Sequence, residues 1–177
     1  IPAGQVLAKN SHGGYSALIR VLLDSDNPGV FPAGAQMVAT YSDLATPALR
    51  DRLNAAHDTV IWIDRGRGDP LHLATVIDVE DHLHAPGDAP GWYDRRRQAG
   101  ARNLTVYCTR NGLPGVNAAM GNRSFFRWIA TLDGTLHIKG FSPLCAPAAV
   151  QFVGEKHAGI HVDVSLVYND NWHANGG

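Results

Sequence analysis

The chain has 177 residues, of which 45% are hydrophobic and 18% charged, and its formal net charge is −1. This composition is typical of a folded globular protein and excludes a disordered chain, and the near-neutral charge excludes a general attraction to nucleic acid or anionic membranes. No apolar run approaches the roughly 20 residues that a membrane-spanning helix needs. The length fits one domain over residues 1–177.

Short apolar and β-branched runs alternate along the chain with stretches of helical pattern. The runs predict eight strands, at 5–9, 36–40, 59–64, 74–80, 103–108, 125–130, 149–153 and 160–167. Helices are predicted at 15–23, 47–56, 92–99 and about 114–120. The second helix has a good start signal, with Thr46 as the N-cap and Pro47 at the first helical position.

Strands that alternate with helices are typical of parallel βαβ units, and eight such strands indicate a closed barrel. A barrel with a helix after every strand takes about 250 residues, which is more than this chain has. The gaps at 65–73 and 154–159 are too short to hold a helix. We therefore expect an α/β fold, a single reduced TIM-like barrel with parallel strands and some outer helices missing.

Two acidic residues lie at the end of the predicted strand 74–80, which reads ATVIDVE. Side chains alternate along a strand, so Asp78 and Glu80 point the same way, roughly 6–7 Å apart. If they line a barrel of parallel strands, they lie at the end that carries the active site, where burial and mutual repulsion raise the pKa of at least one acid. Such a pair suits glycoside hydrolysis, in which one acid protonates the leaving oxygen. The structural alternative is that both acids bind backbone or arginine at the strand end.

A third acid, Asp163, lies in the last predicted strand, within the β-branched run HVDVSLVY. The last strand of a barrel neighbours the first, so we expect Asp163 to face the same opening as Asp78 and Glu80. The alternative is a satisfied structural carboxylate.

Five segments in this order resemble a known family. They are VIDVED at 76–81, LTVYCTRN at 104–111, FRWIATLDG at 126–134, AVQF at 149–152 and HVDVSLVY at 161–168. The set is similar to the family-25 glycoside hydrolases, the lysozyme-like muramidases of phage endolysins and bacterial autolysins, or to a close relative of them.

The resemblance implies a hydrolase of the peptidoglycan glycan strand that acts outside the cell, secreted or delivered by a bacteriophage. It implies that Glu80 is the general acid, that Asp78 orients the substrate's acetamido group or stabilises charge, and that Asp163 is a further acid of the cleft. The sugar-binding floor would be lined by Tyr107, Trp128 and Gln151, because aromatic faces stack on sugar rings and amides bind hydroxyl groups. No cofactor and no metal are expected.

The first predicted strand departs from the family pattern, in which that strand carries an acid. Here it reads QVLAKNSHGG, with Lys9 and Asn10 where an acid is expected. Three explanations are open. Asn10 or Ser11 takes over part of the acid's role in substrate binding, the alignment of the first 70 residues is wrong, or the domain is inactive. An inactive domain would be a glycan-binding or phage-structural module built on the same barrel.

Other motifs favour less specific roles. The pair His82 and His84 resembles a metal motif, but in a Pro/Gly-rich loop we expect a solvated or substrate-contacting segment. The arginine run at 95–97 is expected to be a solvated helix face, with attraction to anionic wall polymers as the alternative and no nucleic-acid role. Cys108 and Cys145 form one disulfide or remain two buried thiols.

Overall fold

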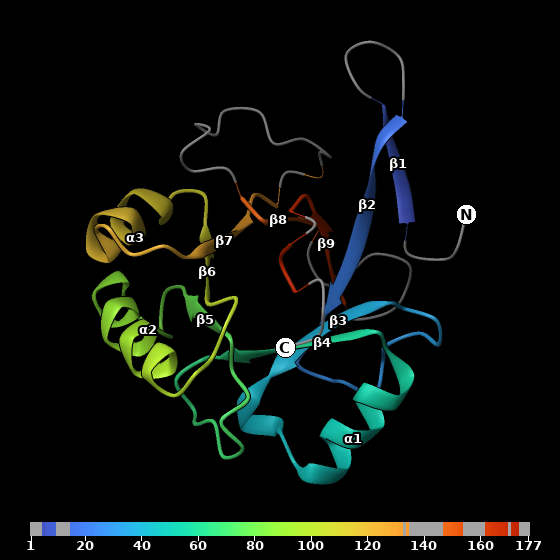
Figure 1. Cartoon of the computed structure of the whole chain (residues 1–177), viewed down its shortest axis with the longest axis horizontal. Coiled ribbons are helices and arrows are strands. Elements are labelled where there is room, and N and C mark those ends of the chain that lie inside the picture. Colours follow the sequence, from blue (N-terminus) through green and yellow to red (C-terminus); the bar gives the residue numbers. More distant parts are fainter. Residues whose placement is uncertain are drawn as a thin grey trace.

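The computed structural model describes residues 5–9, 15–132, 134, 147–153, 162–169 and 171–173, of which 5–9, 15–19 and 153 are described by their backbone alone. Its strands are β1 (Gln5–Lys9), β2 (Tyr15–Asp24), β3 (Met37–Tyr41), β4 (Thr59–Asp64), β5 (Val76–Val79), β6 (Thr105–Thr109), β7 (Phe126–Ala130), β8 (Ala149–Val153) and β9 (Asp163–Val167). Its α-helices are α1 (Pro47–Ala56), α2 (Ala89–Gln98) and α3 (Leu113–Met120) (Figure 1). Every predicted strand is present, with ends that differ by three residues or fewer.

The strands β2 to β9 close into an eight-stranded barrel, because each pairs with the next and β9 pairs back with β2. The pairs from β3–β4 to β7–β8 are parallel, as expected, and β2, which was not predicted as a strand, is parallel to β3. The expectation of parallel strands is wrong for β9, which runs antiparallel to both β8 and β2, and for β1, which runs antiparallel to β2. The connection before β9 is the shortest between successive strands of the barrel, nine residues against eleven between β4 and β5, and short connections favour antiparallel neighbours.

The predicted helix at 15–23 is wrong, since Tyr15–Asp24 forms the ten-residue strand β2. A short apolar run is ambiguous between helix and strand, and here pairing decides, because β2 hydrogen-bonds with β1, β3 and β9. The strand β1 pairs only with β2 and extends with it from one side of the barrel (Figure 1). The first strand of the barrel is therefore β2, and not the first strand of the chain.

Side chains of β5 alternate between the inside and the outside of the barrel, as predicted. Val76 belongs to the interior cluster with Leu22 and Trp128. Ile77 and Val79 belong to a second cluster, which packs the outside of the barrel against α2 and α3. Because Asp78 shares the face of Val76, its carboxyl group lies inside the barrel.

Helices cover only part of the outer surface. Helix α1 begins where predicted, with Thr46 Oγ1 accepting from Leu49 N at 3.1 Å, and its Leu53 packs on Trp62 of β4. No helix separates β4 from β5, as the short gap predicted, and residues 65–75 cross that side as an irregular loop. No helix among the described residues is long and apolar enough to cross a membrane.

Candidate active site at the carboxyl ends of the strands

A group of four acidic residues lies at one end of the barrel, where Asp43 and Asp64 are also found. Asp24 is the last residue of β2, Asp78 lies in β5, Glu80 follows β5 directly, and Asp163 is the first residue of β9. Because β9 is antiparallel, its first residue lies at the same end as the last residue of β2, and Asp24 pairs with Asp163 in register. The fold thus brings together the three predicted acids and adds a fourth, Asp24.

The carboxyl group of Asp78 is kept protonated by its surroundings. The residue is only 2% exposed, and its Oδ1 has no hydrogen-bond partner among the described residues. Burial, followed by the negative charge of Glu80, raises the pKa of Asp78 to about 8, although the positive charge of Arg65 lowers it in part. At neutral pH this carboxyl group is mostly neutral and can donate a hydrogen bond.

Glu80 is less buried and lies nearer to solvent. Burial raises its pKa first and the charge of Asp81 contributes to the rise, whereas a hydrogen bond with the Tyr107 hydroxyl lowers it. A carboxylic acid with a raised pKa retains its proton closer to neutral pH, which is the property that a general acid needs.

Tyr107 is affected by the charges of all four acids. Burial raises the pKa of its hydroxyl group well above the ordinary value, and the negative charges of all four acids raise it further, in the order Glu80, Asp24, Asp78 and Asp163. The hydroxyl donates to Gln151 Oε1 at 2.6 Å. A phenol has one proton, so Tyr107 can donate it either to Gln151 or to Glu80, but not to both at once.

Two residues expected on the sugar-binding floor lie beneath it. Gln151 is 2% exposed, and its Nε2 donates to Asp163 Oδ2 at 2.6 Å, so it links Tyr107 to that acid. Trp128 is fully buried: its ring packs edge-on against Tyr107 with the centroids 5.2 Å apart, and its Nε1 donates to Ser165 Oγ. A buried indole cannot stack on a sugar ring, so Trp128 positions Tyr107 instead of contacting a ligand.

Tyr107 itself is only partly buried, so its ring can still meet a ligand. Asn10, the remaining expected binding residue, lies outside the described residues, as does Cys145. Cys108 is a buried free thiol whose pKa burial raises to about 12, which makes it unreactive at neutral pH.

Arg65 and Tyr41 also belong to this end of the barrel, and sequence reasoning did not select them. The Arg65 guanidinium makes two hydrogen bonds of 2.9 Å to the Asp43 carboxylate and lies over the Tyr41 ring, 4.1 Å from its centroid. The charge of Arg65 also acts on Asp78. In the sequence these two residues are marked only by their positions. Tyr41 is the last residue of β3 and Arg65 directly follows β4, at the same edge as the acids.

A cavity of about 360 Å³ opens beside Glu80. The loop after β5 forms much of its wall, including Asp81, His82 and His84. His84 Nε2 lies 3.4 Å from Asp64 Oδ1, and the other carboxylate oxygen of Asp64 accepts from Trp92 Nε1 at 3.1 Å. Within the described parts of the chain, no group of three or more His, Cys, Asp or Glu side chains is arranged to hold a metal ion.

Asp24 was missed because residues 15–23 were interpreted as a helix and Gln5–Lys9 as the first barrel strand. The signal was present, since an acid directly follows the apolar run VLL at 21–23. The structure shows that the first strand of the barrel is β2 and that β2 ends in an acid. Searches against protein-family models and against curated proteins find no match to this chain.

Proposed function

We propose that this protein hydrolyses the glycan strand of bacterial peptidoglycan, with Glu80 as the general acid and Asp78 assisting. The observation that carries the proposal is the gathering of four carboxyl groups at the end of the barrel where the parallel strands have their carboxyl ends, with Tyr107 within reach of their charges. Barrel enzymes with parallel strands hold their active sites at that end. The proposal treats the barrel as a reduced TIM-like form and places the enzyme outside the cell, at the wall.

In this mechanism Glu80 gives its proton to the glycosidic oxygen, and the bond from that oxygen to the anomeric carbon breaks. The positive charge that develops on the sugar is stabilised by the surrounding carboxylates, among them Asp163 and Asp24. Asp78 is better suited to orient the substrate's acetamido group than to act as the acid, because it is almost fully buried. Water then adds to the anomeric carbon and gives one proton to the Glu80 carboxylate, which completes the hydrolysis and restores the acid.

The alternative, a glycan-binding or phage-structural module without turnover, was motivated by the absence of an acid on the first predicted strand. The first strand of the barrel itself ends in an acid, Asp24. The alternative is retained as one outcome of the experiment that follows.

Release of reducing sugar from purified peptidoglycan tests the proposal, with wild type, Glu80→Gln and Asp58→Asn compared. Asp58 is an exposed acid just before β4, at the other end of the barrel, so its variant controls for the loss of one charge. We expect Glu80→Gln to lower the rate by about 100-fold or more and to melt like wild type, and Asp58→Asn to stay active. Full activity of Glu80→Gln would exclude Glu80 as the acid. Binding without sugar release by wild type, across several wall types, would identify a binding module.

A further inference from the structure

The missing helix between β4 and β5 leaves a cavity on the outside of the barrel. Where a full barrel would carry a helix, the loop 65–75 crosses the surface between α1 and α2, and a cavity of about 570 Å³ remains beside it. Its wall includes Trp62, residues near the amino-terminal ends of β4, β5 and β6, and three arginines. These arginines are Arg50 of α1, Arg96 of α2 and Arg102, which lies between α2 and β6.

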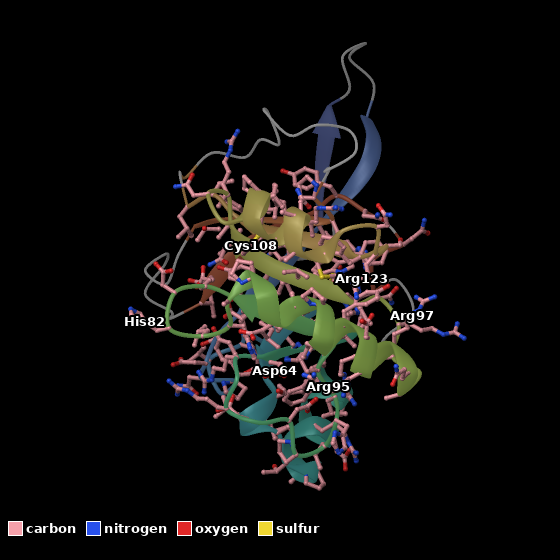
Figure 2. The ribbon with its side chains drawn as sticks, turned by 90° about the vertical axis from the view of Figure 1, so that its left-hand side faces the viewer. Asp64, His82, Arg95, Arg97, Cys108 and Arg123 are labelled. Carbon is pink, nitrogen blue, oxygen red and sulfur yellow. The ribbon has the colours of Figure 1, made fainter. Side chains whose placement is uncertain are left out.

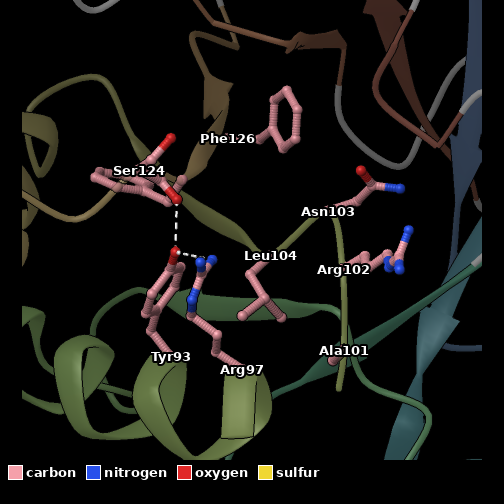
Figure 3. Close-up of a pocket in the computed structure, with 9 residues that line it drawn as sticks. Tyr93, Arg97, Ala101, Arg102, Asn103, Leu104, Ser124 and Phe126 are labelled. Carbon is pink, nitrogen blue, oxygen red and sulfur yellow. Dashed lines mark hydrogen bonds between the residues drawn. The ribbon is translucent and has the colours of Figure 1, made fainter. Parts of the chain in front are cut away.

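A second cavity of about 250 Å³ adjoins the first, and the two share Ala101, Arg102 and Asn103. Arg97 and Ser124 also line the second cavity. Figure 3 shows Arg97 beside Tyr93 on one side of this cavity and Arg102 on the other. We call the two adjoining cavities the arginine groove, after Arg50, Arg96, Arg97 and Arg102. None of the described residues that line it is acidic.

The positive charge of the arginine groove is only partly compensated. Arg50 pairs with Asp51 at 2.7 Å, and Arg96 pairs with Asp69 at 3.4 Å. Arg97 and Arg102 form no ion pair with any residue of the described ranges, and Arg97 only donates to Tyr93 Oη at 3.4 Å.

Stabilisation of helix α2 explains the presence of some of these arginines but not of all of them. Arginines in the last turn of α2 interact favourably with the helix dipole, which accounts for residues 95–97. It does not account for Arg102, which lies beyond the helix and lines both cavities. Arg102 is exposed, borders two cavities and forms no ion pair with the described residues, so its guanidinium donors can face a ligand.

We propose that the arginine groove is a second ligand site, which binds phosphate groups. Guanidinium groups match the oxygens of phosphate with paired hydrogen bonds, and Asn103 and Ser124 add neutral donors. A tetrahedral oxyanion presents oxygens in several directions, so it suits a site whose cations stand on different sides. The combined space accepts a phosphate ester and not only a free ion.

The arginine groove is separate from the acidic site. The groove borders the amino-terminal ends of the strands, whereas the four acids lie at the carboxyl ends. Figure 2 shows this separation, with His82 of the loop beside Glu80 and Arg97 at opposite edges of the molecule. An anion is repelled from the acidic end and attracted to the groove, so the inference goes beyond the proposed hydrolysis and does not depend on it.

Calorimetric titration of the full chain with inorganic phosphate, glycerol 3-phosphate and poly(glycerol phosphate) tests the proposal. The variants are Arg97→Gln and Arg102→Gln. The matched control is Arg95→Gln, which removes an exposed arginine of the same helix turn that lines neither cavity. We expect each test variant to weaken binding by about tenfold and the control to stay within about twofold of wild type. All three variants should melt like wild type, since these side chains are exposed.

The three probes identify the source of the phosphate. Equal affinity per phosphate for all three would assign the site to a single phosphate group, and tighter binding of the polymer would assign it to a chain of phosphodiesters. The proposal is overturned if Arg95→Gln weakens binding as much as the test variants do, because the attraction is then only general charge. It is also overturned if none of the probes shows saturable binding at physiological ionic strength.

Discussion

Asp78 shows how strongly burial controls the chemistry of a single residue. The same carboxyl group on an exposed strand end would be ionised at neutral pH, whereas inside the barrel its pKa rises to about 8. The unfolded chain releases this proton near pH 4, so between about pH 4 and pH 8 the folded state binds a proton that the unfolded state has lost. Stability is therefore greatest below this window and falls as the pH rises through it.

We predict that Asp78→Asn removes this pH dependence. The slope due to Asp78 in wild type is at most about 1.4 kcal/mol per pH unit, since one proton is involved. Urea unfolding at pH 5 and pH 7.5 measures it: wild type should lose at least about 1 kcal/mol more than Asp78→Asn between the two values. An equal loss in both proteins would show that Asp78 ionises normally in the fold.

The acids of the candidate site were predictable from the sequence to different degrees. Asp78, Glu80 and Asp163 each lie inside or at the end of a β-branched run, and that local pattern identifies an acid at a strand end. Arg65 and Tyr41 have no such local pattern. Their part in the site depends on a cation-π contact and a charge interaction across different strands.

At the scale of elements, the loop 65–75 takes the place of a helix and has an internal anchor. Asp69 Oδ1 accepts from Leu73 N at 2.9 Å and its Oδ2 accepts from Ala74 N at 3.0 Å. Arg96 of α2 pairs with the same carboxylate and donates to His72 O at 2.7 Å, so the loop is tied to the neighbouring helix. The gap length showed that no helix would fit, but not how the loop would be held.

We predict that Asp69→Asn lowers the free energy of unfolding by about 1–3 kcal/mol, because an amide has one acceptor oxygen and leaves a backbone N–H without its partner. Asp51→Asn is the control, because its pair with Arg50 is exposed and contributes little, within about 0.5 kcal/mol. Chemical denaturation of both variants and of wild type measures the changes in the free energy of unfolding. Equal stability of the two would mean that the Asp69 hydrogen bonds do not stabilise the loop.

At the scale of the whole molecule, closure of the barrel completes the group of acids. Asp24 and Asp163 are separated by most of the chain and become neighbours only because β9 inserts between β8 and β2. Under the proposed function, Asp24 stabilises the positive charge of the transition state together with Asp163.

We predict that Asp24→Asn lowers the rate of sugar release by about 100-fold without unfolding the protein. Asp26→Asn, an exposed acid two residues further along the chain, should keep the wild-type rate. Both rates are measured on purified peptidoglycan, with melting temperatures as the check on folding. A fully active Asp24→Asn would mean that the acid on the first barrel strand is dispensable.

The sequence by itself determined what depends on neighbouring residues: all eight predicted strands, the capped start of α1, the loop without a helix and the acids Asp78 and Glu80. Tertiary structure alone decided the rest, because it depends on partners far away along the chain. Pairing with three strands made β2 a strand and not a helix. Closure through an antiparallel β9 brought Asp24 to the other acids, and packing hid Trp128 beneath Tyr107. A local pattern can specify which face a side chain takes, whereas the barrel specifies which side chains meet.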